Sequence, residues 1–418
     1  MSRPGGVRWA IVVAGVLICA APAPPAAEQR RPCADSSNIP LPDLTRPYRG
    51  LEPGLFAGGR TTPSPEHAKV GLAQAARVRP LDASGRPATD GRVLLLSIGM
   101  SNTSAEFGRF AQQARAHPAL HDRLTIVNGA LSGADAAMWA DPASRPWQQL
   151  STALRGGRAG AGSAAQVQVI WMKQAHLRTE PFPAEIQNFS RNLETILQTA
   201  SRTFPNLRVV YVSSRTRSGA ESRRGPGEPQ AYESGFAVRR LVEARASQTA
   251  AGAGDAPWVS WGPYLWATAR PRSDGASWGC GDLQSDLLHP SESGNDKVAA
   301  QLLSFFMTEP TAVPWFLEPD RRAAVAPAIT TTADAGAAPL AVEFAAAASP
   351  GARHFWGFGD GTTSIAATPR KTFHVPGAYD VRLTVTDATG GWATSSVRIN
   401  VGGGASPRPL MAPRGSAR

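Results

Sequence analysis

The chain has 418 residues, 42% hydrophobic and 18% charged, which excludes an intrinsically disordered protein. Its net charge is +11, but lysine occurs only at positions 69, 173, 297 and 371 and the arginines are scattered. No basic stripe therefore favours a nucleic acid partner. The three cysteines exclude a disulfide-rich scaffold, and the longest apolar run, 11–21, is too short for a comfortable membrane span.

The first residues are typical of a secretory signal. Arg3 and Arg8 precede an apolar stretch, and Ala- and Pro-rich sequence follows as far as Ala27. We expect a signal peptide over 1–27 and a protein that is secreted, periplasmic or at the cell surface, with no integral span after cleavage. Cleavage leaves Cys33 and Cys280, which are expected to form a disulfide in an oxidising compartment; the alternative is two free thiols.

Residues 28–90 are rich in Pro and Gly and predict an irregular N-terminal arm. From 91 onward, nearly continuous apolar runs predict buried strands, and amphipathic stretches between them predict helices. The expected strands are 93–98, 124–128, 167–172, 207–213 and 258–261, and the expected helices are 104–116, 184–202, 235–250 and 293–307. This alternation predicts an α/β fold over 91–317, a three-layer α/β/α sandwich with a parallel sheet.

Residues 318–328 predict a linker because Pro, Ala and Arg dominate them. From 329 to 401, apolar and polar residues alternate between Gly-rich turns, which predicts a small all-β, Ig-like sandwich domain. The Gly-, Pro- and Arg-rich tail 402–418 is expected to be disordered.

Three residues suggest nucleophilic catalysis. Ser101 directly follows the first predicted strand, where a parallel sheet opens into a cleft. Asp286 and His289 stand three residues apart just before the last predicted helix. Such a histidine takes the serine proton, and the aspartate orients the imidazole. The competing interpretations are a helix-capping serine and an ordinary buried histidine.

Further residues at the predicted strand ends are candidates for substrate contact. Gly133 allows close backbone approach, and the Gln174 side chain offers an amide donor for an oxyanion. Candidate substrate-binding residues are Asn102, Lys173, Arg215 and Trp266. Arg215, with Arg217, either binds an anionic group or is merely solvated. Trp266, with Trp261 and Tyr264, either forms an aromatic platform or packs internally. His176 is a competing base. No metal or cofactor is implied.

The order of these motifs resembles that of the SGNH (GDSL-like) hydrolase family over roughly 91–307. The resemblance implies a flavodoxin-like fold, Ser101 as nucleophile, Asp286 and His289 as its partners, and an oxyanion hole from the Ser101 amide, Gly133 and Gln174. Two departures stand out. The family's Gly-Asp-Ser is Gly-Met-Ser at 99–101, and its Gly-x-Asn-Asp is replaced by Lys-Gln-Ala at 173–175.

The C-terminal region resembles a PKD (polycystic-kidney-disease-type) domain. The run Trp-Gly-Phe-Gly-Asp-Gly at 356–361 is followed by Pro-Gly-Ala-Tyr-Asp-Val at 376–381. Trp356 and Phe358 are expected to alternate into the sandwich core, and Asp360 to stabilise a turn. The resemblance implies a spacer or a module that contacts a surface or a polymer.

Together these patterns predict a secreted serine esterase acting on an acylated small molecule or polysaccharide, with O-acetyl carbohydrate esters as one substrate class. A lipase is a further alternative. The rival from another class is a non-catalytic polysaccharide-binding or adhesion protein on a degenerate SGNH fold. The replacement of Gly-x-Asn-Asp by Lys-Gln-Ala at 173–175 and the PKD-like module favour it.

Overall fold

A computed structural model of the protein describes residues 36–155, 162–219, 225–250, 256–323, 326–347 and 351–402. The predicted signal peptide 1–27, Cys33 and all but the first residue of the predicted tail 402–418 lie outside these ranges. Among the helices of the described residues, none is long and apolar enough to cross a bilayer.

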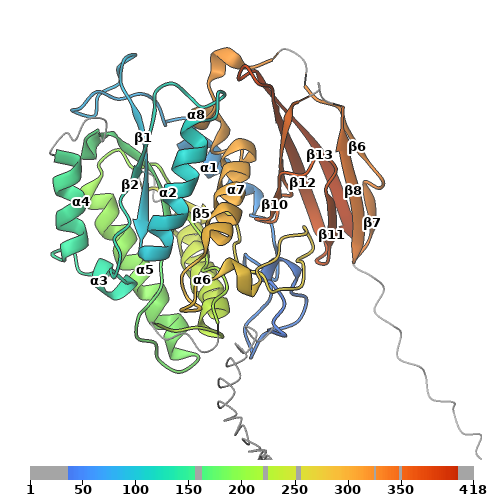
Figure 1. The fold of residues 1–418 in the computed structure, drawn as a ribbon, viewed down its shortest axis with the longest axis horizontal. Coiled ribbons are helices and arrows are strands. Elements are labelled where there is room, and N and C mark those ends of the chain that lie inside the picture. The colour runs from blue at the N-terminus through green and yellow to red at the C-terminus, as the bar shows by residue number, and fades with distance from the viewer. Residues whose placement is uncertain are drawn as a thin grey trace, which may run out of the picture. The chain divides into compact units, whose positions relative to one another are not determined.

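A five-stranded parallel sheet forms the centre of the larger domain (Figure 1). Its strands lie in the order β2-β1-β3-β4-β5, the flavodoxin-like order of doubly wound folds. Their bounds are β1 Val93–Gly99, β2 Leu124–Asn128, β3 Val167–Lys173, β4 Val209–Val212 and β5 Trp258–Trp261. The predicted α/β fold with a parallel sheet is confirmed. Every residue of β1 and β3 is buried, as expected for strands covered on both faces.

Alternate residues of β1 enter two different cores, because side chains along a strand point to opposite faces. Leu94 and Leu96 pack in the core that includes helices α5 (Ala184–Thr203) and α6 (Gln230–Ala250). Val93 and Leu95 pack with helices α2 (Ser101–Arg115) and α7 (Glu292–Thr308), which contact each other on the other face. Helices therefore cover both faces of the sheet.

Among the described residues, four α-helices were not expected from the sequence: α1 (Pro65–Ala75), α3 (Ala136–Ala140), α4 (Arg145–Arg155) and the short α8 (Val313–Phe316). The predicted irregular arm therefore contains one regular element. Ser64 caps α1 by accepting a hydrogen bond from the His67 amide, and Pro65 occupies the first turn. Both are signals of a helix start. Of the expected helices, that at 104–116 begins earlier, at Ser101, and that at 235–250 begins at Gln230.

The C-terminal region forms two sheets, as predicted for a small β-sandwich. A five-stranded sheet runs β10-β9-β12-β13-β7, and a three-stranded sheet runs β11-β8-β6. Trp356 and Phe358 lie fully buried in its core. The strands are β6 Ile329–Thr331, β7 Ala335–Ala337, β8 Leu340–Ala346, β9 Arg353–Gly357, β10 Thr363–Ser364, β11 Arg370–Phe373, β12 Gly377–Thr386 and β13 Trp392–Gly402.

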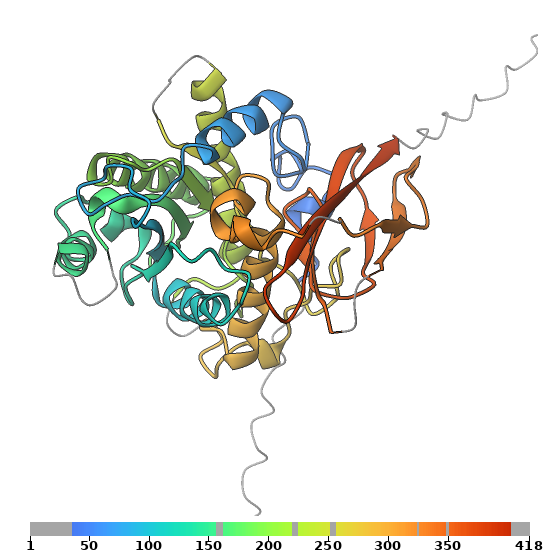
Figure 2. The ribbon, with the colours of Figure 1, turned by 90° about the horizontal axis from the view of Figure 1, so that it is seen from above.

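The sandwich packs directly against helix α7 of the α/β domain (Figure 2). Phe355 on β9 and Trp392 on β13 belong to the same hydrophobic core as α2 and α7. The Ser304 hydroxyl donates to the backbone oxygens of Trp356 and Ser364, at 2.9 and 3.1 Å. The two domains therefore share one continuous apolar core in addition to the separate core of the sandwich.

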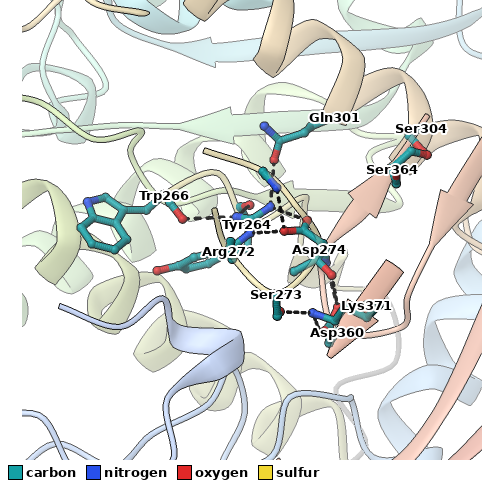
Figure 3. A network of polar contacts seen from close by, with 12 residues as sticks. Tyr264, Trp266, Arg272, Ser273, Asp274, Gln301, Ser304, Asp360, Ser364 and Lys371 are labelled. Carbon is teal, nitrogen blue, oxygen red and sulfur yellow. Dashed lines mark hydrogen bonds and ion pairs between the residues drawn. The ribbon is translucent and has the colours of Figure 1, made fainter. Parts of the chain in front are cut away.

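A buried network of charges joins the two domains (Figure 3). Lys371 on β11 is fully buried, and its ammonium group lies 2.7 Å from the Asp360 carboxylate and 2.6 Å from the Ser273 hydroxyl. Asp360 also accepts hydrogen bonds from Thr362 within its own turn. Nearby, Arg272 forms a bidentate ion pair with Asp274. Asp360 thus stabilises its turn, as expected, and also compensates a buried lysine.

The segment predicted as a linker, 318–328, forms hydrogen bonds with both domains. The Glu318 amide donates to the Ala119 carbonyl of the α/β domain, and the Trp392 indole donates to the Glu318 carbonyl at 2.7 Å. Farther along, the Ala323 amide donates to the Trp392 carbonyl. Within the described residues, this connection is packed rather than free.

Candidate active site

The candidate site lies beyond the carboxyl ends of the parallel strands, where doubly wound folds bind ligands. Ser101 is the first residue of α2, two positions after β1 ends, and Gln174 directly follows β3. These two strands flank the point where the strand order reverses. A Cβ at Gly99 would overlap Thr103 and the Lys173 carbonyl, so only glycine fits where β1 turns into α2.

The three residues predicted to act together form one hydrogen-bonded chain. Ser101 Oγ lies 2.9 Å from His289 Nε2, and His289 Nδ1 lies 2.6 Å from Asp286 Oδ2. Because the carboxylate only accepts, Nδ1 donates to Asp286, which leaves Nε2 free to accept the Ser101 proton. The arrangement therefore has the geometry of a nucleophile, a base and an orienting carboxylate.

The loop 284–289 builds this geometry through its own backbone. Asp286 Oδ1 accepts hydrogen bonds from the amides of Leu288 and His289. Burial raises the pKa of the Asp286 carboxyl, but these bonds and the imidazole outweigh burial and hold the pKa below its usual value. Leu287 has a φ of +57°, a left-handed conformation that is costly for leucine. Asn102 steadies the loop by donating to the Leu288 carbonyl at 3.0 Å.

The start of α2 leaves the Ser101 hydroxyl available for chemistry. The residue at the cap position is Met100, and no side chain caps the helix. The capping interpretation of Ser101 is therefore wrong, since its hydroxyl contacts His289 instead. The first amides of a helix lack intrahelical partners and favour a negative charge, so the Ser101 amide suits an oxyanion.

The side-chain amide of Gln174 lacks hydrogen-bond partners in the described part of the chain. Its side chain is 3% exposed, and within the described residues neither Oε1 nor Nε2 has a hydrogen-bond partner. Leaving a buried amide without partners is costly, so both groups are available to hydrogen-bond a water molecule or a ligand in the pocket that Gln174 lines. Gly133 lies in the exposed turn after β2 with a φ of +76°, at the same end of the sheet, but does not line the pocket.

Lys173 is not a free cation, because a carboxylate that the sequence analysis did not identify neutralises it. Its ammonium group lies 2.7 and 2.6 Å from the two oxygens of Glu106 on α2, and both side chains are buried. Burial raises the pKa of Glu106 and lowers that of Lys173, although each faces the opposite charge. Glu106 shares the buried face of α2 with Thr103 and Phe107, which was the available signal.

His176, the competing base, is held away from this role. Its Nδ1 lies 2.8 Å from Glu185, and its Nε2 accepts from the Asn192 amide at 2.9 Å. Both ring nitrogens are therefore occupied by protein groups. Neither partner was singled out from the sequence, because both come from α5, distant from the strand end that carries the histidine.

Two predicted surface roles are corrected by burial. Trp266 is fully buried and its indole donates to Glu228, so the aromatic platform proposed with Trp261 and Tyr264 is wrong. These rings pack in the core because the chain after β5 crosses beneath the N-terminal arm. Arg217 is 1% exposed and donates to the Trp278 carbonyl, so it is not solvated either.

A small, partly open pocket lies beside Ser101. Its lining includes the polar residues Ser101, Asn102, Lys173, Gln174 and Arg215, and the remaining lining is largely apolar, including Met100, Leu177, Pro226 and Leu288. A few convergent polar groups in an apolar concavity are typical of a small-molecule site.

Cys280 lies in the short 3₁₀ turn that precedes the Asp286 loop and is disulfide-bonded. Its predicted partner, Cys33, lies outside the described residues. The pairing of these two cysteines stays a prediction.

A family model described as PKD domain matches residues 324–401. The C-terminal sandwich is a PKD domain. No curated protein matches the sequence. Among solved structures, the PKD1 domain of the Vibrio cholerae metalloprotease PrtV is 31% identical, over 18% of this chain and 98% of that chain, with a TM-score of 0.16.

Two further solved structures are similar to parts of the chain. XAC1771, described as a carbohydrate acetylesterase from Xanthomonas citri, is 12% identical over 74% of this chain and 78% of that chain, with a TM-score of 0.29. A structure of carbohydrate-binding modules of the β-sandwich superfamily is 24% identical over 19% of this chain, with a TM-score of 0.17. This chain spans about a third, 34%, of the length of that structure.

Proposed function

We propose that the protein is a serine esterase in which Ser101, His289 and Asp286 hydrolyse acyl esters. The observation that carries the proposal is the 2.9 Å contact between Ser101 Oγ and His289 Nε2, with Asp286 fixing the other ring nitrogen. A serine hydroxyl is a poor nucleophile at neutral pH, and a neutral imidazole in hydrogen-bond reach removes its proton during attack.

The reaction proceeds in two halves. Ser101 Oγ bonds to the ester carbonyl carbon as its proton passes to His289 Nε2. The bond to the alcohol oxygen then breaks, and the leaving alcohol takes that proton, which leaves an acyl-serine. Water next attacks the acyl carbon, gives a proton to Nε2, and releases the carboxylic acid as Ser101 regains its proton. Asp286 stabilises the imidazolium in both halves.

The oxyanion formed in each half is held by the Ser101 amide, the Gly133 amide and the Gln174 side chain. The proposed role of Gln174 Nε2 as a donor is supported by its burial and by its lack of a hydrogen-bond partner among the described residues. Gly133 is included because the SGNH resemblance assigns it this role; its turn after β2 is exposed and does not line the pocket. Donors placed in advance in this way lower the barrier because they need not reorganise during the reaction.

Hydrolysis of 4-nitrophenyl acetate by the purified protein tests the proposal, with Ser101→Ala as the inactive variant and Ser104→Ala as its matched control one turn along α2. We expect Ser101→Ala to abolish both hydrolysis and labelling by a fluorophosphonate probe, and Ser104→Ala to retain both. A wild-type protein that hydrolyses no acetyl or longer acyl ester and escapes the probe would overturn the esterase proposal. Retained binding to an acetylated polysaccharide would then favour the non-catalytic alternative.

We further propose that the protein is exported and that Cys33 pairs with Cys280. The disulfide-bonded state of Cys280 supports an oxidising compartment. Thiol titration of the denatured mature protein is expected to find no free thiol, and two free thiols would contradict the pairing. Contact of the PKD domain with a surface polymer stays a prediction, tested by pulldown with insoluble polysaccharides.

A further inference from the structure

Arg215 follows β4 and reaches into the pocket that contains Ser101 and Gln174. Its backbone amide donates to the Ser234 hydroxyl, which fixes the start of the side chain. The residue is 7% exposed. Its guanidinium makes one long hydrogen bond, 3.5 Å to the Ser218 hydroxyl, and forms no ion pair with any carboxylate in the part of the chain that the structure describes.

The three carboxylates whose charges act on Arg215, those of Glu106, Glu228 and Glu185, already accept hydrogen bonds from other groups. Glu106 accepts both of its short contacts from Lys173. Glu228 accepts from the Trp266 indole and from two backbone amides. Glu185 accepts from His176 and the Glu180 amide. Burial lowers the pKa of Arg215, and these three acids oppose that effect only from beyond ion-pair distance.

Arg272 is a second buried arginine, and it shows how many acceptors a buried guanidinium group can have in this fold. It is bound bidentately by Asp274, at 2.8 Å for both contacts, and also donates to the carbonyls of Tyr264 and Trp266 (Figure 3). Arg272 therefore has a full set of acceptors, and it does not line the pocket beside Ser101. Arg215 has a similar degree of burial, lacks such a set, and borders the space beside the nucleophile. A buried charge without a partner is costly, and a bound anion offsets that cost.

We propose that Arg215 binds a carboxylate of the substrate, so that the ester hydrolysed by Ser101 carries a negative charge close to the scissile bond. This inference rests on the proposed esterase function and names its substrate class. A guanidinium presents donors that match the two oxygens of a carboxylate. The carboxylate belongs either to the acyl half, as in a dicarboxylic hemiester, or to the alcohol half, as in an acylated uronic acid.

Binding is tested first, because it does not require catalysis. Adipate, a dicarboxylate, and adipamide, its neutral analogue, are titrated calorimetrically into the wild type, Arg215→Gln and Arg178→Gln, where Arg178 is an exposed arginine near the same end of the sheet. We expect adipate, but not adipamide, to bind the wild type and Arg178→Gln. The substitution Arg215→Gln should weaken adipate binding about 10- to 100-fold. Equal binding of adipate to Arg215→Gln, or none to the wild type, would overturn the proposal.

Kinetics then identify the source of the carboxylate. The 4-nitrophenyl hemiester of adipic acid is compared with 4-nitrophenyl hexanoate, and acetylated polygalacturonate with an acetylated neutral galactan. We expect the wild type to hydrolyse the anionic member of one pair faster, mainly because its KM is lower. In Arg215→Gln this preference should fall about 10- to 100-fold, and Arg215→Lys should restore part of it. Equal rates within both pairs for the wild type would refute the substrate class.

The two proposals fail in different ways. If no ester is hydrolysed but adipate binding still depends on Arg215, the anion site stands and the esterase function falls. If Arg215→Gln does not fold, the wild type still decides, through its discrimination between adipate and adipamide.

Discussion

At the scale of single residues, the unpartnered amide of Gln174 has the most direct consequence for catalysis. If its Nε2 donates to the oxyanion, Gln174→Ala is expected to lower kcat about 10²- to 10³-fold and to change KM little, because the bond strengthens only in the transition state. Gln198→Ala, an exposed glutamine on α5, serves as control. A Gln174→Ala enzyme with normal kcat would remove the side chain from the oxyanion hole.

The Asp286 carboxylate predicts a dependence of stability on pH. Its pKa is lower in the folded protein than the unfolded value of about 3.9. Its contribution to stability is therefore present above pH 4 and is lost as the pH falls through the folded pKa. We expect the stability difference between wild type and Asp286→Asn, measured by urea denaturation, to be constant from pH 7 to 5 and to shrink towards pH 3.

The exposed Asp90 makes no hydrogen bond among the described residues, so Asp90→Asn is the control for this series. It is expected to shift the unfolding free energy little at any pH. A difference for Asp286→Asn that stays unchanged down to pH 3 would show that the carboxylate has no depressed pKa in the folded state.

At the scale of elements, the buried pair of Glu106 and Lys173 fixes helix α2 to strand β3. Ser101 begins that helix and Gln174 follows that strand, so the pair sets the spacing between the nucleophile and its oxyanion donor. Removing one partner leaves the other buried without compensation.

We expect Glu106→Gln to lower the unfolding free energy by about 3–5 kcal/mol, and the double variant Glu106→Leu with Lys173→Met to recover most of that loss. The exposed pair of Arg321 and Asp122 provides the control, since Asp122→Asn should cost under about 1 kcal/mol. Chemical denaturation measures all of these variants. Equal effects of Asp122→Asn and Glu106→Gln would contradict a structural role for the buried pair.

The sequence predicts what is encoded by neighbouring residues. The apolar runs predict all five parallel strands, and the cap at Ser64 with Pro65 was a readable signal for the missed helix α1. The pairing of Lys173 with Glu106, and the burial of Trp266 against Glu228 and Tyr232, depend on contacts between distant segments. No local pattern contains them, because they follow from how the layers pack.

At the scale of the whole molecule, the shared core and the Lys371 network couple the PKD domain to the α/β domain. Burial lowers the pKa of Lys371, but Asp360, Asp43 and Asp274 outweigh it and raise the pKa above its usual value. A raised lysine pKa stabilises the fold fully below about pH 10.4, and this contribution is lost only as the pH rises through the folded pKa.

Lys371→Met is expected to destabilise the protein by about 3–5 kcal/mol, because it leaves Asp360 buried beside an apolar side chain. Arg398→Met, which removes the exposed ion pair with Asp380, should cost under about 1 kcal/mol.

Thermal unfolding followed by far-UV and near-UV circular dichroism should give one coincident transition for the wild type. Two separated transitions would show that the domains unfold independently.

The burial of Phe355 and Trp392 against α7 also limits how the gene can be remodelled. A PKD module from another protein, joined at residue 324, would need matching aromatic side chains. Without them, the apolar surface of α7 that contacts the sandwich would be exposed to solvent. Chimeras of this protein should therefore express well only when the graft retains those two rings and Lys371.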